Sequence, residues 1–293
     1  MKIMIGEPRV VEAGRGAAWW SEGWHLFKSG FWTWIGIMVI YLIITMLISL
    51  VPYVGSVGHW LLTPVFMGGL MLGCQALERN EPLRVAHLFE GFQGAHFVPL
   101  MIIGAVNIAL SLGIGALAVA GVMGSLKVAD MARMGAMGDP LGAFLGTARA
   151  LTGTTLLVIL LILVIAAVFA MLNWFAPALV AVGGATAVEA MKLSFLSCMR
   201  NWVPFLVYGL IGIAIGVATL VLVVGLALTM GASALLGGSG SGWGALIGLI
   251  VLFIVVSTIV ALVVGPIVFG STYSSYKDTL AAEDDALGNP AYQ

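Results

Sequence analysis

Charge is the scarcest property of this 293-residue chain. Only 9% of its residues are Asp, Glu, Lys or Arg, whereas 61% are hydrophobic and the mean hydropathy is +1.12. A soluble globular domain usually carries about 25% charged residues, so the composition excludes a soluble fold. The few charges are also segregated, because four long stretches contain none of them. These stretches are 30–77, 91–126, 150–188 and 201–276.

The charge-free stretches predict six membrane-spanning helices in an all-α, polytopic membrane helix bundle. A helix needs roughly 20 apolar residues to cross a hydrocarbon core about 30 Å thick. No predicted span contains an ionisable side chain, so the sequence does not indicate an intramembrane proton or ion pathway. The predicted spans are about 31–51, 57–77, 97–124, 151–177, 202–230 and 243–276.

Cysteine, histidine and basic clusters are too sparse to indicate a chemical site. Cys74 and Cys198 form no CxxC pattern, so buried, inert thiols are the favoured interpretation. The four histidines show no HExxH or other ligand spacing. A net charge of -1 excludes a strongly basic surface for nucleic acid. We therefore expect no catalytic residues, no cofactor, no metal and no nucleic-acid partner.

Two patterns suggest a ligand but have simpler structural interpretations. Met131, Met134 and Met137 fall at i, i+3 and i+6 and could offer soft ligands to Cu(I). Methionine more often fills gaps in irregular apolar packing, and the same loop holds no His or Cys. The glycine-rich run 237–242 lacks the Gly-Lys-Ser/Thr ending of a phosphate-binding loop, so it is interpreted as a flexible hairpin turn.

The six spans fall into three units, each a surface helix followed by a helical hairpin. Each even-numbered span carries one proline, at Pro64, Pro177 and Pro266, and the next charged residue follows 11 to 14 positions later. At helical rise the three prolines therefore lie at similar depths, where a missing N–H kinks a helix. The alternative is six unrelated spans. The units are about 17–80, 83–188 and 189–276, after a leader 1–16 and before a tail 277–293.

Aromatic residues mark the start of each unit. Trp20, Trp24 and Phe27 recur at i, i+4 and i+7, the spacing of one helical face. Because indole rings favour headgroup depth, a helix over 17–28 is predicted to lie in the membrane surface. A second surface segment is predicted over 83–93. The predicted interfacial anchors are Trp20, Trp24, Phe27, Phe89, Phe92 and Trp202.

A few polar residues and the three prolines form the candidate cavity or hinge. Asn173 lies four residues before Pro177, so its amide could satisfy carbonyls freed by a kink, which is the structural interpretation. The functional interpretation places it on the floor of a polar cavity between repeats, as in transporters with broken helices. The candidate residues are Asn107, Asn173, Pro64, Pro177 and Pro266.

Lysine and arginine are unequally divided between the two sides of the predicted bundle. Nine of them fall on the side of the N-terminus and three on the other, which places both termini in the cytoplasm. The three exceptions lie in the link 125–149, part of which is a candidate interfacial segment. They are Lys127, Arg133 and Arg149.

Two segments resemble known families. Residues 15–27, RGAAWWSEGWHLF, resemble the opening of an uncharacterised family of proteobacterial multi-span membrane proteins, a likeness that covers nearly the whole chain. The Pro-Ala-Leu-Val motif at 177–180, with Glu189, Lys192 and Trp202, is similar to a group that includes the membrane-anchor domain of glycerophosphoryl diester phosphodiesterase, over about the last third. The resemblance implies a bacterial inner membrane. It carries no catalytic residues onto these positions.

Two functional hypotheses follow. The first is a non-enzymatic inner-membrane protein with a scaffold, accessory or lipid-environment role, whose partners are membrane lipids and also another membrane protein or a second copy. The second is a transporter or channel for a small neutral or amphiphilic solute, which requires a water-accessible cavity at the candidate residues. An intramembrane enzyme ranks third, because no paired nucleophile and base are present.

Overall fold

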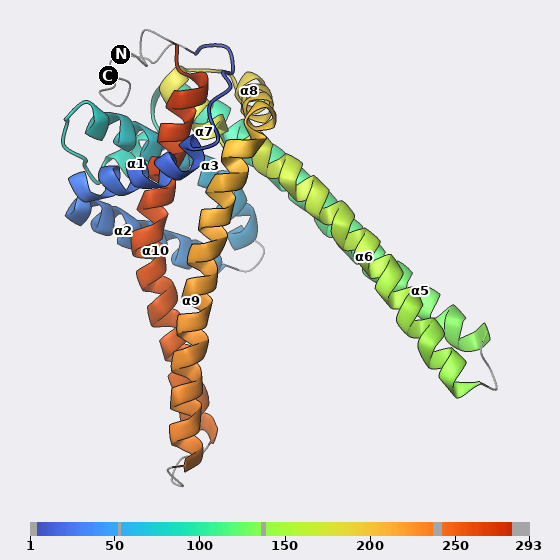
Figure 1. The fold of residues 1–293 in the computed structure, drawn as a ribbon. Helices are drawn as coiled ribbons and strands as arrows, with labels where there is room; N and C mark the ends of the chain where they lie inside the picture. The colour runs from blue at the N-terminus through green and yellow to red at the C-terminus, as the bar shows by residue number, and fades with distance from the viewer. Residues whose placement is uncertain (1–4, 52–53, 136–138, 237–241, 283–293) are drawn as a thin grey trace.

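Long helices dominate the computed structural model, which describes residues 5–51, 54–135, 139–236 and 242–282 (Figure 1). Within these ranges there is no β-strand beyond one isolated bridge between Ile5 and Ala281. Six helices are long and apolar enough to cross a membrane, which confirms the predicted all-α bundle with six spans. They are α2 (Phe31–Ser49), α3 (Val54–Glu78), α5 (Phe97–Gly135), α6 (Pro140–Asn173), α9 (Trp202–Leu236) and α10 (Gly242–Leu280).

A short helix precedes each pair of long ones. These short helices are α1 (Arg15–Ser29), α4 (His87–Glu90) and α8 (Ala187–Arg200), and a 3-10 turn (Gly94–His96) separates α4 from α5. The start of α8 is encoded locally, because Gly184 adopts a φ of 77° and the Thr186 hydroxyl accepts the Glu189 N–H at 3.4 Å. The order of short, long and long helix thus occurs three times, as the sequence pattern predicts.

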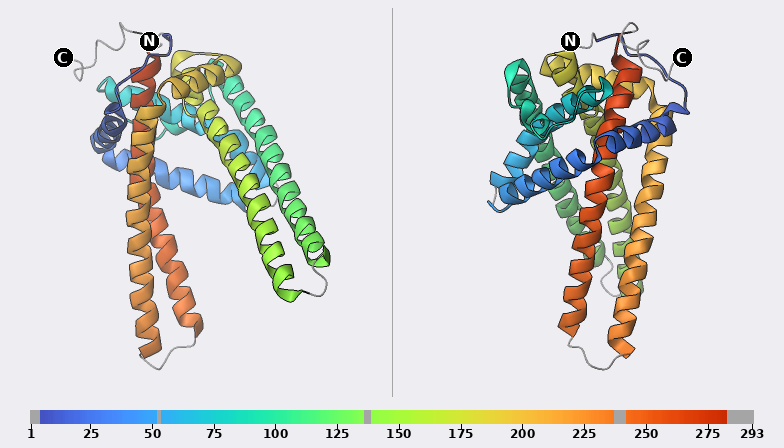
Figure 2. Two further views of the ribbon diagram at one scale, coloured as in Figure 1. Left: turned by 45° about the vertical axis from the view of Figure 1, so that its right-hand side comes forward. Right: turned by 90° about the vertical axis from the view of Figure 1, so that its left-hand side faces the viewer.

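Each short helix packs on the hairpin of another unit. α1 crosses α10 and also contacts α9, α4 lies on α3, and α8 lies on α6 and α5 (Figures 1 and 2). The first unit therefore rests on the third, the second on the first and the third on the second. This cyclic order closes the three units into a ring at one end of the molecule.

Small residues allow these crossings. A Cβ on Gly23 of α1 would lie 2.3 Å from the Ile267 carbonyl oxygen of α10, and one on Gly91 would lie 1.9 Å from the Val65 oxygen of α3. On α8 the Ser194 hydroxyl donates to the Met171 carbonyl at 2.6 Å. Backbones that approach this closely gain contact area, which is the main source of helix association in lipid.

The three proline-containing segments differ in local structure. Pro64 and Pro266 lie inside the continuous helices α3 and α10. By contrast α6 ends at Asn173, four residues before Pro177, because the proline ring clashes with the carbonyl at i-4. The chain resumes as α7 (Ala176–Ala178) and a π-helical turn η2 (Leu179–Gly183). The departure from a regular α-helix thus precedes Pro177, within the candidate span Leu156–Gly183.

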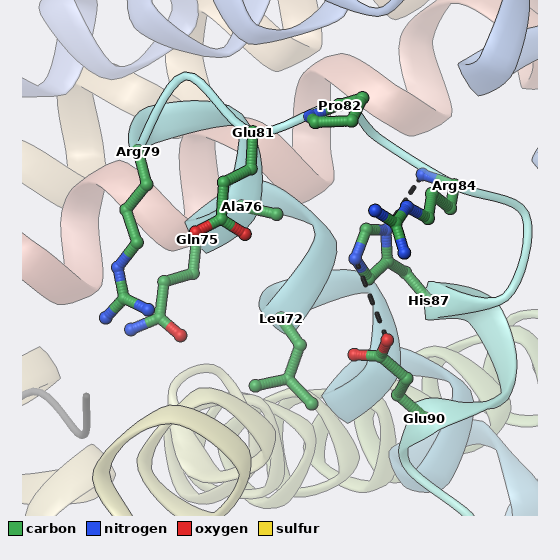
Figure 3. Close-up of a pocket in the computed structure, with 9 residues that line it drawn as sticks. All are labelled: Leu72, Gln75, Ala76, Arg79, Glu81, Pro82, Arg84, His87 and Glu90. Atoms are coloured by element: carbon green, nitrogen blue, oxygen red, sulfur yellow. Dashed lines mark hydrogen bonds and ion pairs between the residues drawn. The ribbon is translucent and has the colours of Figure 1, made fainter.

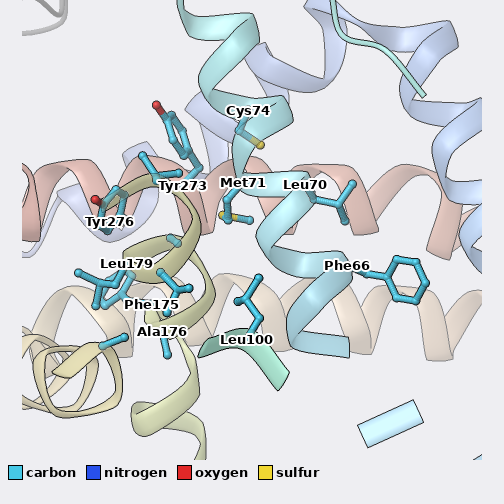
Figure 4. Packing of buried hydrophobic residues seen from close by; sticks show 14 of the residues in the cluster. Phe66, Leu70, Met71, Cys74, Leu100, Phe175, Ala176, Leu179, Tyr273 and Tyr276 are labelled. Carbon is cyan, nitrogen blue, oxygen red and sulfur yellow. The ribbon is translucent and has the colours of Figure 1, made fainter. Parts of the chain in front are cut away.

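The buried core lies where the proline-containing segments meet (Figure 4). Gly68, four residues after Pro64, has Leu100 and Ala181 within 3.4 Å of the position of its missing Cβ, and Ala181 is four residues after Pro177. Corresponding parts of the first two units thus contact each other. The buried residues labelled in Figure 4 are Phe66, Leu70, Met71, Cys74, Leu100, Phe175, Ala176, Leu179, Tyr273 and Tyr276.

The two longest hairpins diverge from this packed end. α5 pairs with α6 and α9 pairs with α10, and the two pairs point in different directions (Figures 1 and 2). The first hairpin is shorter, and α2 runs crosswise to α9 and α10 (Figure 2). No residue in the most apolar stretches of α6 and α9 is buried. These hairpins are therefore stabilised by few contacts outside their own pair.

Several predicted boundaries change because helices extend further than hydropathy indicates. α5 continues to Gly135 and α6 begins at Pro140, so most of the predicted polar link 125–149 is helical. α10 continues to Leu280, with Lys277 and Asp278 buried, so the predicted tail boundary at 277 is too early. Met137, residues 237–241 of the glycine-rich run and residues 283–293 of the tail lie outside the described residues.

Substitution of Gly23 by alanine is expected to weaken the α1–α10 crossing. The helices must separate to admit the methyl group, at a cost of about 1–3 kcal/mol. The control is Gly36→Ala in α2, where a Cβ would meet nothing within 4 Å and where alanine favours the helix by about 1 kcal/mol. Thermal unfolding in detergent should give a lower midpoint for Gly23→Ala alone. Equal midpoints for the two variants would contradict a close contact between α1 and α10 at Gly23.

Candidate functional site

The polar end of the ring contains the N-terminal segment, held by Asn201. The Asn201 Oδ1 atom accepts the Val11 N–H at 2.9 Å, and its Nδ2 atom donates to the Arg9 carbonyl at 2.8 Å. Asn201 is 1% exposed, and the Gly6 N–H donates to the Leu280 carbonyl at 2.8 Å. The predicted leader is thus ordered from Ile5 onward and joins the third unit.

A buried carboxylate connects α1 with α10. The Asp278 Oδ2 atom accepts hydrogen bonds from Arg15 Nε at 2.6 Å and from Trp19 Nε1 at 2.7 Å. Arg15 also donates to Glu22 at 2.8 Å. Burial raises the pKa of Glu22, since desolvation outweighs the opposing effect of the Arg15 charge. Asp278 itself is 5% exposed, so these hydrogen bonds lie in the protein interior.

A second polar contact connects α3 with α10. Lys277 forms an ion pair with Glu78, whose other carboxylate oxygen accepts the Tyr273 hydroxyl at 2.7 Å. Glu78 and Lys277 are the first charged residues after Pro64 and Pro266. The charges that end two predicted spans therefore neutralise each other.

A cavity of about 400 Å³ lies beside α4, between the end of α3 and the loop that follows it (Figure 3). Leu72 and Ala76 form part of its apolar lining. In Figure 3 the polar ends of Gln75 and Arg79 lie side by side on one flank, and His87 and Glu90 lie on the other. The polar residues that line the cavity are Gln75, Arg79, Glu81, Arg84, His87 and Glu90.

Hydrogen bonds fix one flank of this cavity and leave a donor on the other. The Arg84 backbone N–H donates to His87 Nδ1 at 2.9 Å, so a neutral His87 carries its proton on Nε2, which is 3.7 Å from Glu90 Oε1. Gln75 is 7% exposed, and its buried Nε2 atom has no hydrogen-bond partner. The wall of the cavity therefore holds a buried amide N–H group whose hydrogen bond a ligand oxygen could accept.

The predicted cavity or hinge residues lie away from this cavity, and none of them lines it. Pro64, Pro177, Pro266 and Asn107 are buried, whereas Asn173 is half-buried. The Asn173 amide donates to the Phe169 carbonyl at 2.9 Å, within its own helix. The Asn107 Oδ1 atom is buried without a partner. A water-accessible site at these residues stays a prediction.

The predicted anchors occupy both exposed and buried positions. Trp24, Phe89 and Trp202 are exposed, whereas Phe27 belongs to the protein core. Trp20 stacks on Tyr208 at a ring-centroid distance of 4.9 Å, and Phe92 packs against Phe66 at 5.0 Å. Lipid contact of the exposed anchors stays a prediction.

Sequence reasoning missed Trp19, which is fully buried and bonds Asp278. The buried face of α1 consists of Gly16, Trp19, Gly23 and Phe27, at i, i+3, i+7 and i+11. A helical spacing that includes the glycines could have revealed this face, because small residues mark close helix crossings.

The comparisons with known proteins agree with this architecture. A probable inner membrane protein of Burkholderia thailandensis is 29% identical over 227 residues, which cover 76% of this chain and 82% of that protein. The chain is a multi-pass inner-membrane protein. No family model and no solved structure matches it. The resemblance to the phosphodiesterase membrane anchor stays a prediction.

Replacing Asp278 by alanine is expected to destabilise the protein severely. Arg15 and Trp19 would lose their shared acceptor, and breaking a buried ion pair costs about 3–5 kcal/mol. Asp139→Ala removes an exposed aspartate and is the matched control. The midpoint of thermal unfolding in detergent should fall for Asp278→Ala and stay constant for Asp139→Ala. An unchanged midpoint for Asp278→Ala would disprove the role of this carboxylate.

Proposed function

We propose that the chain is a non-enzymatic inner-membrane protein that organises the lipids around it. The observation that supports this function is the divergence of two long apolar hairpins from one packed, polar end (Figure 1). Leu163 on α6 and Leu220 on α9 are each 60% exposed, like many apolar neighbours along these helices. Such surfaces require lipid or a membrane partner, because water would not tolerate them.

The lengths of these helices favour an effect on the bilayer. The candidate spans that include α5, α6, α9 and α10 have 27 to 31 residues, which corresponds to about 40–47 Å at helical rise. The hydrocarbon core is only about 30 Å thick. Long hairpins must therefore tilt or thicken the surrounding bilayer, and two diverging hairpins impose different tilts on the lipids between them.

A transporter or channel for a small neutral or amphiphilic solute is the second candidate. The break between α6 and α7 and the unpartnered Asn107 oxygen favour it, since broken helices and buried polar groups line many transport sites. Against it, the proline-containing segments are packed into the core. A route for solute would require those segments to separate.

A paired measurement distinguishes the two candidates. The protein purified in mild detergent is expected to retain several phospholipids in native mass spectrometry. Proteoliposomes should take up glycerol or urea no faster than protein-free liposomes in stopped-flow light scattering, because the proline-containing segments are packed into the core. Faster uptake would favour the transporter, and a protein that retains no lipid would refute the lipid-organising function.

The proposed orientation places the polar end in the cytoplasm. The described ends of the chain pair there through Ile5 and Ala281, and Arg15 bonds Asp278 in the last turn of α10 (Figure 1). The exposed Asp139 joins α5 to α6 at the far end. Positive residues on one side of the membrane favour a cytoplasmic location for that side.

Labelling of single cysteines in intact cells tests this orientation. A membrane-impermeant maleimide should label Asp139→Cys directly and Ser21→Cys only after permeabilisation. The native thiols should stay unlabelled, because Cys74 is buried and burial raises the pKa of Cys198 to about 12. The wild-type chain is the control. Labelling of Ser21→Cys in intact cells would reverse the orientation.

A further inference from the structure

The cavity beside α4 is lined by charges of both signs. Arg79 and Arg84 contribute two guanidinium groups, and Glu81 and Glu90 contribute two carboxylates. The carboxylates would repel a multiply charged anion, and the guanidinium groups would repel a simple cation. A ligand that carries one group of each sign can place each of its charges beside an opposite charge.

Gln75 adds a specific preference for an oxygen acceptor. Its Nε2 atom is buried in the cavity wall without a hydrogen-bond partner. A buried donor left unsatisfied costs about 1–3 kcal/mol, so a ligand oxygen within reach of this amide would remove that cost. The amide lies beside the polar end of Arg79 (Figure 3), so one oxygen-rich ligand group can accept hydrogen bonds from both side chains.

The position of the cavity suits the headgroup layer. The candidate span in α3 ends at Glu78, so Arg79 and the residues of the loop follow directly after it. Leu72 and Ala76 lie on the side of the span, and the nearby Phe89 ring is 38% exposed. A polar site with an apolar wall at this depth fits an amphiphile, since headgroups and aromatic rings share the interface. The volume also lies within the range of small-ligand sites.

We propose that this cavity binds a phosphoethanolamine group. The Arg79 guanidinium contacts the phosphate, as arginine does in most phosphate sites, and the adjacent Gln75 amide donates to a phosphate oxygen (Figure 3). Glu90, on the opposite flank, contacts the ammonium group. The inference rests on the lipid-organising function proposed above and names the chemical class of lipid and the site that recognises it.

Native mass spectrometry of the delipidated full-length chain tests this inference. Titration with dioctanoyl phosphatidylethanolamine should give binding about tenfold tighter than with dioctanoyl phosphatidylglycerol, which lacks the ammonium group, since one hydrogen bond to a charged group accounts for that ratio. Arg79→Gln should weaken both lipids, because both carry phosphate. Glu90→Gln should weaken only the ethanolamine lipid and so abolish the preference.

The variants have a matched control and a fold check. Lys192→Gln removes an exposed positive charge on α8 and should leave both affinities unchanged. Arg79 is exposed and Glu90 half-buried, so the thermal midpoints of these two variants should stay at the wild-type value. A purely structural role of Glu90 would change both affinities together, whereas recognition of the ammonium group changes only one.

Free phosphoethanolamine separates a lipid headgroup from a soluble ligand. If free phosphoethanolamine at the same concentration does not displace the lipid, the cavity recognises a lipid headgroup. If it displaces the lipid fully, the ligand is a soluble molecule with the same phosphate and ammonium groups. Equal affinity for the two lipids, or a preference that survives in Glu90→Gln, would overturn the proposal. The lipid-organising function would still stand if wild-type protein retained lipid without preference, so the two failures are distinguishable.

Discussion

One buried carboxylate, that of Asp278, joins the first and last units of the chain. It is separated from its partners Arg15 and Trp19 by about 260 residues of sequence, and both partners donate to the same carboxylate oxygen. The closest backbone approach of α1 and α10, at Gly23, lies two turns along α1 from Arg15. Charge pairing and close packing therefore act at the same crossing, and together they close the ring of three units.

The ring explains why the two ends of the molecule differ. At the polar end each short helix contacts a hairpin of another unit, so long-range contacts accumulate there. Beyond it α5 contacts α6 and α9 contacts α10, and the pairs diverge. A water-soluble protein would collapse such hairpins together to bury their apolar side chains. In lipid this force is absent, so the divergence persists without a hydrophobic penalty.

The sequence predicts the features that depend on local composition. Charge-free length predicts six spans, and the aromatic and proline spacing predicts three units, because lipid imposes both rules on each segment separately. The burial of Trp19 rather than Trp24 was not predicted, although the two are five residues apart and therefore lie on different faces of α1. That choice depends on α10, which is remote in sequence. The break at Asn173 was equally hidden, because Pro64 and Pro266 lie in continuous helices, whereas at the broken turn the Ser194 hydroxyl of α8 bonds both Met171 and Phe175.

The end of α3 serves both the ring and the cavity. Gln75 and Glu78 are three residues apart, so they lie on adjacent positions of one helical face, with Gln75 in the cavity wall and Glu78 paired with Lys277 of α10. A ligand that orders Gln75 therefore acts on the same turn that joins the first unit to the third. The direction in which the α9–α10 hairpin leaves the polar end depends on that junction, because α10 carries Lys277, Asp278 and the Gly23 crossing. A ligand bound in the cavity would thus be linked to the packing of α10 through a single helical turn.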